Sequence, residues 1–92
     1  MRVLDLLGRR WALRVLWELR DGARTFRALR DACDAVSPSS LNQRLGDLRG
    51  LGVVVLGDDG YALTPSGERL ARILIDLHRW SEATLGDSRA AK

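Results

Sequence analysis

The sequence predicts a small, mainly helical domain with one short β-hairpin. Three observations lead to this fold class. Apolar residues recur at helical spacing over most of the 92-residue chain. The spacing changes once, at residues 53–56, where a β-branched run is followed by a turn and a short returning strand. Helix-capping signals divide the helical part into separate segments. At this length we expect one domain, placed at residues 1–86, with a polar C-terminal tail at 87–92.

The first helix is expected over residues 4–19, and Asp21-Gly22 is the signal that ends it. The core side of this segment carries the apolar residues Ala12, Val15, Leu16 and Leu19. Leu13 and Trp17 stand one turn apart beside that side, so they form a second apolar strip that is suited to face another subunit.

Two further helices follow at short spacing. Thr25 is a suitable N-cap for a short helix through Cys33. Ser37-Pro38 then combines a capping hydroxyl with proline at the first helical position. The helix that begins there ends near residues 50–52, and its inward stripe is Leu41, Leu45 and Leu48.

The rest of the chain reads as a hairpin and a long helix. The strands are expected at residues 53–56 and 61–63, joined by Gly57-Asp58-Asp59-Gly60. Thr64-Pro65 starts a helix of about five turns, with apolar positions Leu70, Ile73, Leu74, Leu77, Trp80 and Leu85. Helix, short helix, helix, hairpin and long helix is the plan of a winged helix-turn-helix domain.

The charge is unevenly distributed. The formal net charge of +3 divides into +4 for residues 1–50 and −1 for residues 51–92, and every basic residue except Lys92 is arginine. A basic region rich in arginine suits a polyanionic partner, because the guanidinium group binds phosphate and guanine well. Codon bias in a G+C-rich genome is an equally good explanation of the arginine content.

Other site types find little support. The single cysteine, Cys33, excludes an internal disulfide and a cysteine-based zinc site, and its position favours a buried structural thiol over a sensor. His78 stands alone, so no metal or cofactor is expected. No catalytic nucleophile, paired carboxylates or phosphate-binding glycine loop stands out, which predicts that the protein is not an enzyme. Without an 18-residue apolar run or a signal peptide, the sequence predicts a cytoplasmic protein.

An ordered set of residues spans the chain from about Leu4 to Leu85. Its members are Gly8, Trp11, Leu16, Leu19, Gly22, Arg24-Thr25-Phe26, Leu29, Ser37, Leu41-Asn42-Gln43-Arg44-Leu45, Leu48, Leu51-Gly52-Val53, Tyr61, Leu63-Thr64, Gly67, Leu70 and Trp80. This set resembles the HxlR-type winged-helix transcriptional regulators, relatives of the MarR group. The resemblance implies a homodimer whose terminal helices build the interface, with one DNA-reading helix in each subunit.

The sequence departs from the family pattern at three places. Family members commonly carry a redox-sensing cysteine before the first helix, and residues 1–7 have none. Their wing is usually longer and basic, whereas this one is trimmed to an acidic turn containing Asp58 and Asp59. The position after Leu45 is Gly46, where relatives often have a basic residue. These departures leave open whether the wing touches DNA, since its closely spaced carboxylates suit turn formation and would repel phosphate.

The candidate DNA-binding residues lie mainly on the second helix of the motif. A helical wheel places Ser39, Ser40, Gln43 and Asp47 on its outer side, with Asn42 and Arg44 at the flanks. The serine, amide and arginine side chains suit contacts to base edges and phosphates, and the helix start at Ser37 adds backbone donors for phosphate. Arg24 and Arg27 are candidate phosphate contacts near the short helix, and Arg30 is a weaker one. The alternative is that these side chains form an ordinary solvated surface.

The expected dimer interface lies on the terminal helices. Its candidate residues are Leu4, Leu7, Leu13, Trp17, Leu74, Leu77 and Trp80. Trp11 and Trp80 are expected in the core or the interface, with an aromatic-lined ligand pocket as the alternative. The predicted function is a homodimeric, sequence-specific regulator that binds double-stranded DNA at a near-palindromic operator; any small-molecule effector is unknown. The alternative is a winged-helix module that binds another protein, with weak or no DNA binding.

Overall fold

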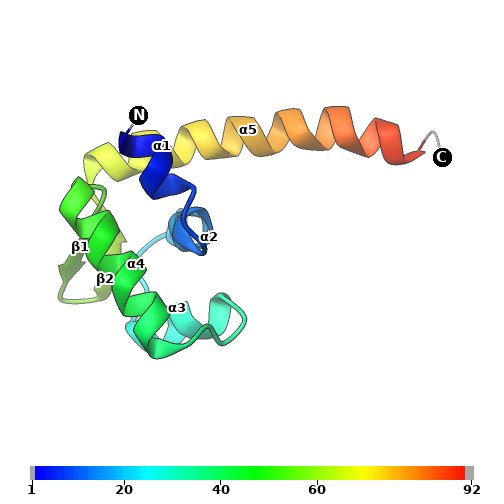
Figure 1. Cartoon of the computed structure of the whole chain (residues 1–92). Coiled ribbons are helices and arrows are strands. Elements are labelled where there is room, and N and C mark those ends of the chain that lie inside the picture. Colours follow the sequence, from blue (N-terminus) through cyan, green and yellow to red (C-terminus); the bar gives the residue numbers. More distant parts are fainter. Residues whose placement is uncertain (1, 91–92) are drawn as a thin grey trace.

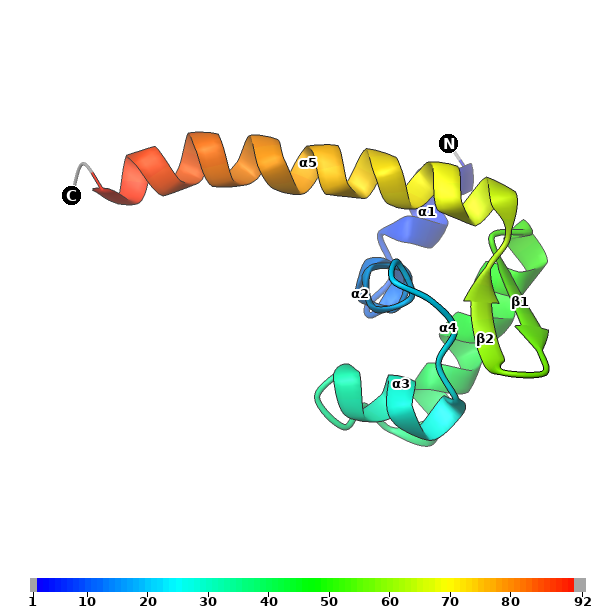
Figure 2. The same ribbon diagram turned by 180° about the vertical axis from the view of Figure 1, so that it is seen from behind.

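The computed structural model describes the backbone of residues 2–90 and the side chains of residues 2–85. Its elements follow the order α1 (Arg2–Leu7), α2 (Ala12–Glu18), α3 (Phe26–Ala32), α4 (Pro38–Leu51), β1 (Val54–Gly57), β2 (Gly60–Leu63) and α5 (Pro65–Ala90). The predicted fold class, mainly helical with one hairpin, is confirmed. In both views α3 lies at the opposite end of the molecule from α5, and the second half of α5 extends beyond the other elements (Figures 1 and 2).

The core is aliphatic and is built around α2. This helix packs against α1, α3, α4 and α5. The fully buried leucine and valine side chains come from α2 and its C-cap, α3 and α4: Val15, Leu16, Leu19, Leu29, Leu41, Leu45 and Leu48. Burying one such side chain contributes about 1.5–3 kcal/mol relative to leaving it exposed. The inward stripe that the sequence predicted for α4 is therefore confirmed, and the outer side of α4 is left for other contacts.

The single helix expected over residues 4–19 is wrong. Gly8 N donates to Leu4 O at 2.8 Å and ends α1, and Trp11 precedes α2 with a φ of 76°. The half-buried Trp11 side chain packs against the core, which compensates the strained backbone. Both short helices pack on the same core, so their apolar residues continue one helical spacing across the break.

The caps of the helix-turn-helix unit are as the sequence predicts, and the structure adds the turn between its helices. The Thr25 hydroxyl accepts a hydrogen bond from Ala28 N at 3.1 Å, and the Ser37 hydroxyl accepts one from Ser40 N at 3.2 Å. Between α3 and α4 the chain turns tightly through two residues with φ near 57°, Asp34 and Ala35. The turn is held by the Arg30 guanidinium, whose Nε donates to Val36 O at 2.7 Å.

The hairpin is tied to the rest of the molecule through β2. β1 and β2 pair antiparallel in the register Val54↔Leu63 to Gly57↔Gly60. Arg24 and Tyr61 exchange two backbone hydrogen bonds of 2.9 and 2.8 Å, which attach β2 to the segment before α3. Gly60 has a φ of 111°, and a Cβ there would overlap the Arg24 carbonyl. The hairpin is thus held close to the start of α3.

α5 is longer than the sequence indicated. The helix continues to Ala90, so residues 87–90 of the expected polar tail are helical. Residues 91–92 of that tail lie outside the described part of the chain. The domain boundary at residue 86 stays a prediction.

Candidate nucleic-acid interface

α4 turns a polar surface away from the core. Ser39, Asn42 and Gln43 are exposed on it, opposite the buried leucines of the same helix. Asn42 and Gln43 make no hydrogen bond or ion pair with any other described side chain. Amide groups in this state are available for base edges, because Gln or Asn can pair bidentately with adenine.

The first turn of α4 is capped and polar. The Ser37 hydroxyl, which caps the helix, also donates to Ser40 Oγ at 2.9 Å. Ser40 is half-buried, so its hydroxyl stabilises the first turn more than it faces solvent. Ser39 is exposed beside the unpaired N–H groups that every helix start carries, and its hydroxyl makes only a long contact of 3.5 Å with Ser37 Oγ. Of the three serines predicted to bind DNA, Ser39 is therefore the one whose hydroxyl is least used within the protein, and the other two position the helix start.

Arg44 does not extend into solvent as a base-reading arginine would. Its side chain is only 13% exposed, and Nη1 lies 3.0 Å from Asp47 Oδ2. The same Asp47 oxygen lies 3.1 Å from Nη1 of Arg9, which comes from the segment between α1 and α2. Two guanidinium groups thus share one carboxylate oxygen on the flank of α4.

The arginines near α3 differ in their freedom. Arg24 Nε donates to Glu18 O at 2.8 Å, and its guanidinium lies 3.9 Å from the Glu18 carboxylate. Contacts within the protein therefore already hold this side chain in place. Arg30 donates its hydrogen bond to Val36 O, as described above. Arg27 is exposed and pairs with no described residue. Of the three, Arg27 is the one most accessible to a phosphate group.

The hairpin tip is acidic and its outer strand is apolar. Asp58 and Asp59 are exposed at the turn. Val55 and Leu56 on β1 are 47% and 48% exposed. This surface carries no arginine or lysine on residues 54–63, so it offers no cation to DNA.

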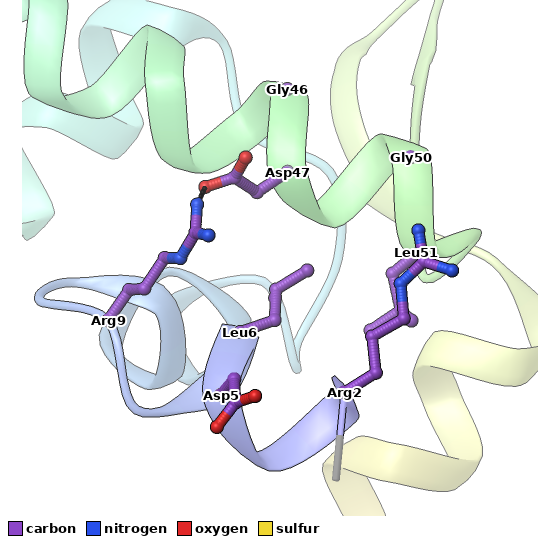
Figure 3. Close-up of a pocket in the computed structure, with 8 residues that line it drawn as sticks. All are labelled: Arg2, Asp5, Leu6, Arg9, Gly46, Asp47, Gly50 and Leu51. Atoms are coloured by element: carbon purple, nitrogen blue, oxygen red, sulfur yellow. Dashed lines mark hydrogen bonds and ion pairs between the residues drawn. The ribbon is translucent and has the colours of Figure 1, made fainter.

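A groove of about 570 Å³ lies between α1 and α4 (Figure 3). α1 and the residues after it supply Arg2, Asp5, Leu6 and Arg9, and α4 supplies Gly46, Asp47, Gly50 and Leu51. Sequence reasoning did not single out Arg2 or Arg9. The available signal was the Gly8-Arg9-Arg10-Trp11 segment, which looked like the middle of a helix and is in fact the break between two.

The residues predicted for a dimer interface divide into two groups. Leu4, Leu13, Leu77 and Trp80 are exposed, whereas Leu7 and Leu74 are half-buried against the core. Trp17 is half-buried and packs against His78 of α5, with ring centroids 5.0 Å apart and the ring planes tilted by 53°. A shallow hollow of about 250 Å³ lies between α2 and α5, lined by Leu13, Trp17, Leu74, Leu77, His78 and Ser81. Its lining includes Trp17, and neither Trp11 nor Trp80.

Cys33 is fully buried, as predicted. Burial raises the pKa of its thiol, which keeps the group neutral. Among the described residues no group of three or more His, Cys, Asp or Glu side chains is placed to hold a metal ion. The same part of the chain contains no helix with the length and apolar character needed to span a membrane.

Comparison with known proteins places this geometry in a family. Residues 6–89 match the family described as HxlR-like helix-turn-helix. YvaP, an HTH-type transcriptional regulator of Bacillus subtilis (strain 168), is 30% identical over 87 residues, which cover 87% of this chain and 81% of that protein.

Two solved structures share the fold. Quinone-bound YodB from B. subtilis has a TM-score of 0.81 at 26% identity and covers 89% of this chain and 93% of its own. A possible HxlR family transcriptional factor from Thermoplasma volcanium GSS1 has a TM-score of 0.77 at 28% identity, covering 88% and 79%. The chain therefore belongs to the HxlR-like helix-turn-helix family of DNA-binding transcriptional regulators.

Proposed function

We propose that this chain is a sequence-specific transcriptional regulator that binds double-stranded DNA as a homodimer on a near-palindromic operator. The observation that carries the proposal is the outer side of α4, where Asn42 and Gln43 are exposed and unpaired behind a capped first turn. In a dimer the two α4 helices would enter successive major grooves about 34 Å apart.

The structure supports different roles for the candidate DNA contacts. Gln43 and Asn42 are available for base edges, and Ser39 and Arg27 for phosphates. Arg44 can reach DNA only by exchanging Asp47 for a phosphate or a guanine. Ser37, Ser40 and Arg24 already make hydrogen bonds within the protein, so we assign them to holding α3 and α4 in place. We therefore expect Gln43→Ala to weaken operator binding more than Arg44→Ala.

The homodimer is supported by the apolar surface on α2 and α5. Leu77 and Trp80 are 54% and 60% exposed on α5, and Leu13 of α2 lines the same shallow hollow as Leu77. A single copy of this small domain leaves these side chains in water, whereas pairing with a second copy would bury them.

Selection from a random duplex library tests the proposal. We expect enrichment of an inverted repeat whose affinity falls steeply with salt, because phosphate contacts release counterions. Gln43→Ala should reduce affinity for the selected sequence by roughly 5- to 100-fold, the effect of one good bidentate base contact of about 1–3 kcal/mol. Operator affinity unchanged in both Gln43→Ala and Arg44→Ala would reject α4 as the reading helix.

The hairpin favours the second candidate, a protein-binding module. Exposed Val55 and Leu56 beside the acidic turn would suit a partner protein with an apolar surface and a basic rim. This alternative predicts that the folded protein enriches no duplex and that its weak DNA binding is the same for every sequence. Enrichment of an inverted repeat would decide against it.

A further inference from the structure

We propose that α1 and the segment after it supply a second DNA-contacting surface, in which Arg2 and Arg9 bind the sugar-phosphate strand that passes the C-terminal half of α4. The inference deepens the proposed function and rests on it, since it requires α4 to lie in the major groove. The site is the groove between α1 and α4 (Figure 3).

The floor of this groove lies on the same side of α4 as Ser39 and Gln43, which we call the reading surface of this helix. Ser39, Gln43, Gly46 and Gly50 follow one another at spacings of four, three and four residues, so they share one side of the helix. The first two positions carry polar side chains and the last two carry none. A Cβ at Gly46 or Gly50 would meet no atom within 4 Å, so this half of α4 faces open space. The helix backbone is thus accessible to a close ligand where side chains would otherwise stand.

The wall of the groove carries two guanidinium groups that have N–H donors available for a ligand. Arg2 pairs with no other described residue. The Arg9 side chain is 53% exposed, and only its Nη1 contacts Asp47. Because a guanidinium has five N–H donors, others on Arg9 are available for a ligand. Asp47 is already contacted by Arg44 as well, which offsets its charge. Figure 3 shows Arg2 and Arg9 projecting from the α1 side toward α4 near opposite ends of the groove.

The dimensions of the DNA major groove would place a sugar-phosphate strand in the groove between α1 and α4. The major groove is about 12 Å wide and a helix with its side chains is about 10–12 Å across, so a helix that lies in it has sugar-phosphate strands along its flanks. Arg2 and Arg9 stand on one such flank. The hairpin, which carries Asp58 and Asp59, offers no cation to DNA. The groove is also lined by the carboxylate of Asp5. Arg2 of α1 and Arg9, which follows that helix, therefore supply cations that the short acidic hairpin and Gly46 do not, and the contact depends on these two side chains and not on a net charge of α1.

The salt dependence of operator binding tests the proposal. On a selected operator, Arg2→Ala and Arg9→Ala should each flatten the slope of log affinity against log salt by about 0.9 for each phosphate that the variant no longer binds, and so by about 1.8 for a dimer. Both should weaken operator and scrambled duplex by similar factors, because phosphate contacts carry no sequence information. Arg79→Ala, on the exposed side of α5, is the matched control and should leave the slope unchanged.

The outcomes separate this inference from the function on which it rests. If the wild-type protein prefers an operator in a Gln43-dependent way, and Arg2→Ala and Arg9→Ala keep the wild-type slope, the α1 contact is overturned and the proposed function stands. If the wild-type protein enriches no duplex, both are overturned.

Two further measurements exclude other roles for these arginines. Arg9→Ala/Asp47→Asn should keep the flattened slope; a return to the wild-type slope would mean that Arg9 only neutralises Asp47, and would overturn its contact. Inorganic phosphate is the probe for a small-anion site. Thermal stabilisation by phosphate that depends on Arg2 and Arg9, together with unchanged DNA slopes, would assign the groove to a free anion and overturn the DNA contact.

Discussion

Asp47 is the carboxylate that two arginines, one on α4 and one beside it, contact together. Its Oδ2 atom lies 3.0 Å from Arg44 and 3.1 Å from Arg9, and its side chain is 25% exposed. The Arg9 side chain is 53% exposed, and a surface ion pair of this kind typically contributes below about 1 kcal/mol. The effect of the two contacts here is positional, because Arg44 is held along the flank of α4 and Arg9 is held beside the reading surface. The sequence around Asp47 could not reveal that Arg9 also contacts this carboxylate, since Arg9 lies 38 residues earlier in the chain.

Cys33 gives the residue-scale prediction, because burial raises the pKa of its thiol. In the unfolded chain the thiol ionises near pH 8.5, whereas in the folded chain it stays protonated to higher pH. The contribution of Cys33 to stability is therefore present below about pH 8.5 and disappears as the pH rises toward the folded-state pKa. Above about pH 8.5 we expect the free energy of unfolding to fall by up to about 1.4 kcal/mol per pH unit from this group.

Denaturant titrations from neutral to alkaline pH measure this effect, with Cys33→Ala as the control that lacks the thiol. The wild-type curve should fall more steeply than that of Cys33→Ala over this range. Thiol-reactive reagents should modify the native protein slowly and the denatured protein quickly. Rapid modification of native protein at neutral pH would contradict the structural role and revive a sensing role for this thiol.

At the scale of elements, one hydroxyl joins the end of α4 to the start of α5. Thr64 Oγ1 donates to Gly52 O at 2.6 Å and accepts from Gly67 N at 3.1 Å. Gly67 is required beside it, because a Cβ there would overlap the Val53 carbonyl. Thr64→Ala removes both side-chain hydrogen bonds, so we expect the free energy of unfolding to fall by about 1–3 kcal/mol.

Chemical denaturation of three variants checks the Thr64 prediction. Thr64→Ser keeps the hydroxyl and should recover most of the missing stability. Ser66→Ala, at an exposed position in the first turn of α5, should stay within about 0.5 kcal/mol of the wild type. If Thr64→Ser is as unstable as Thr64→Ala, the methyl group and not the hydroxyl holds this joint.

The elements also show where sequence reasoning succeeds and where it stops. Caps at Thr25, Ser37 and Thr64 are local features, so the helix starts they predict are confirmed. The break between α1 and α2 depends on a left-handed Trp11 held by tertiary packing, which apolar spacing does not encode. The groove between α1 and α4 depends on that break, and for this reason the predicted site included α4 and omitted Arg2 and Arg9.

At the scale of the whole molecule, the chain measures 46 × 27 × 24 Å because α5 extends beyond the other elements. The apolar side of this helix remains uncovered, with Ile73, Leu77 and Trp80 each more than half exposed. Half-buried Leu74 and Trp17 connect that side to the core, so the uncovered surface is continuous with well-packed residues. An apolar surface continuous with the core is suited to a symmetric pairing of two copies.

Leu77→Asp tests whether this surface forms the dimer. A carboxylate at this position would have to be buried without a partner, which costs several kcal/mol in each subunit of a symmetric dimer. We expect the wild type to sediment as a dimer and Leu77→Asp as a folded monomer, because Leu77 is 54% exposed in the single copy and contributes little to its core. Asp76→Ala, one residue away, should remain dimeric. The monomer should bind a single half-site and a full operator with nearly equal affinity, since it no longer gains from linking two half-sites. A Leu77→Asp protein that still sediments as a dimer would place the interface elsewhere, and operator binding that keeps its full affinity in a proven monomer would separate DNA recognition from dimer formation.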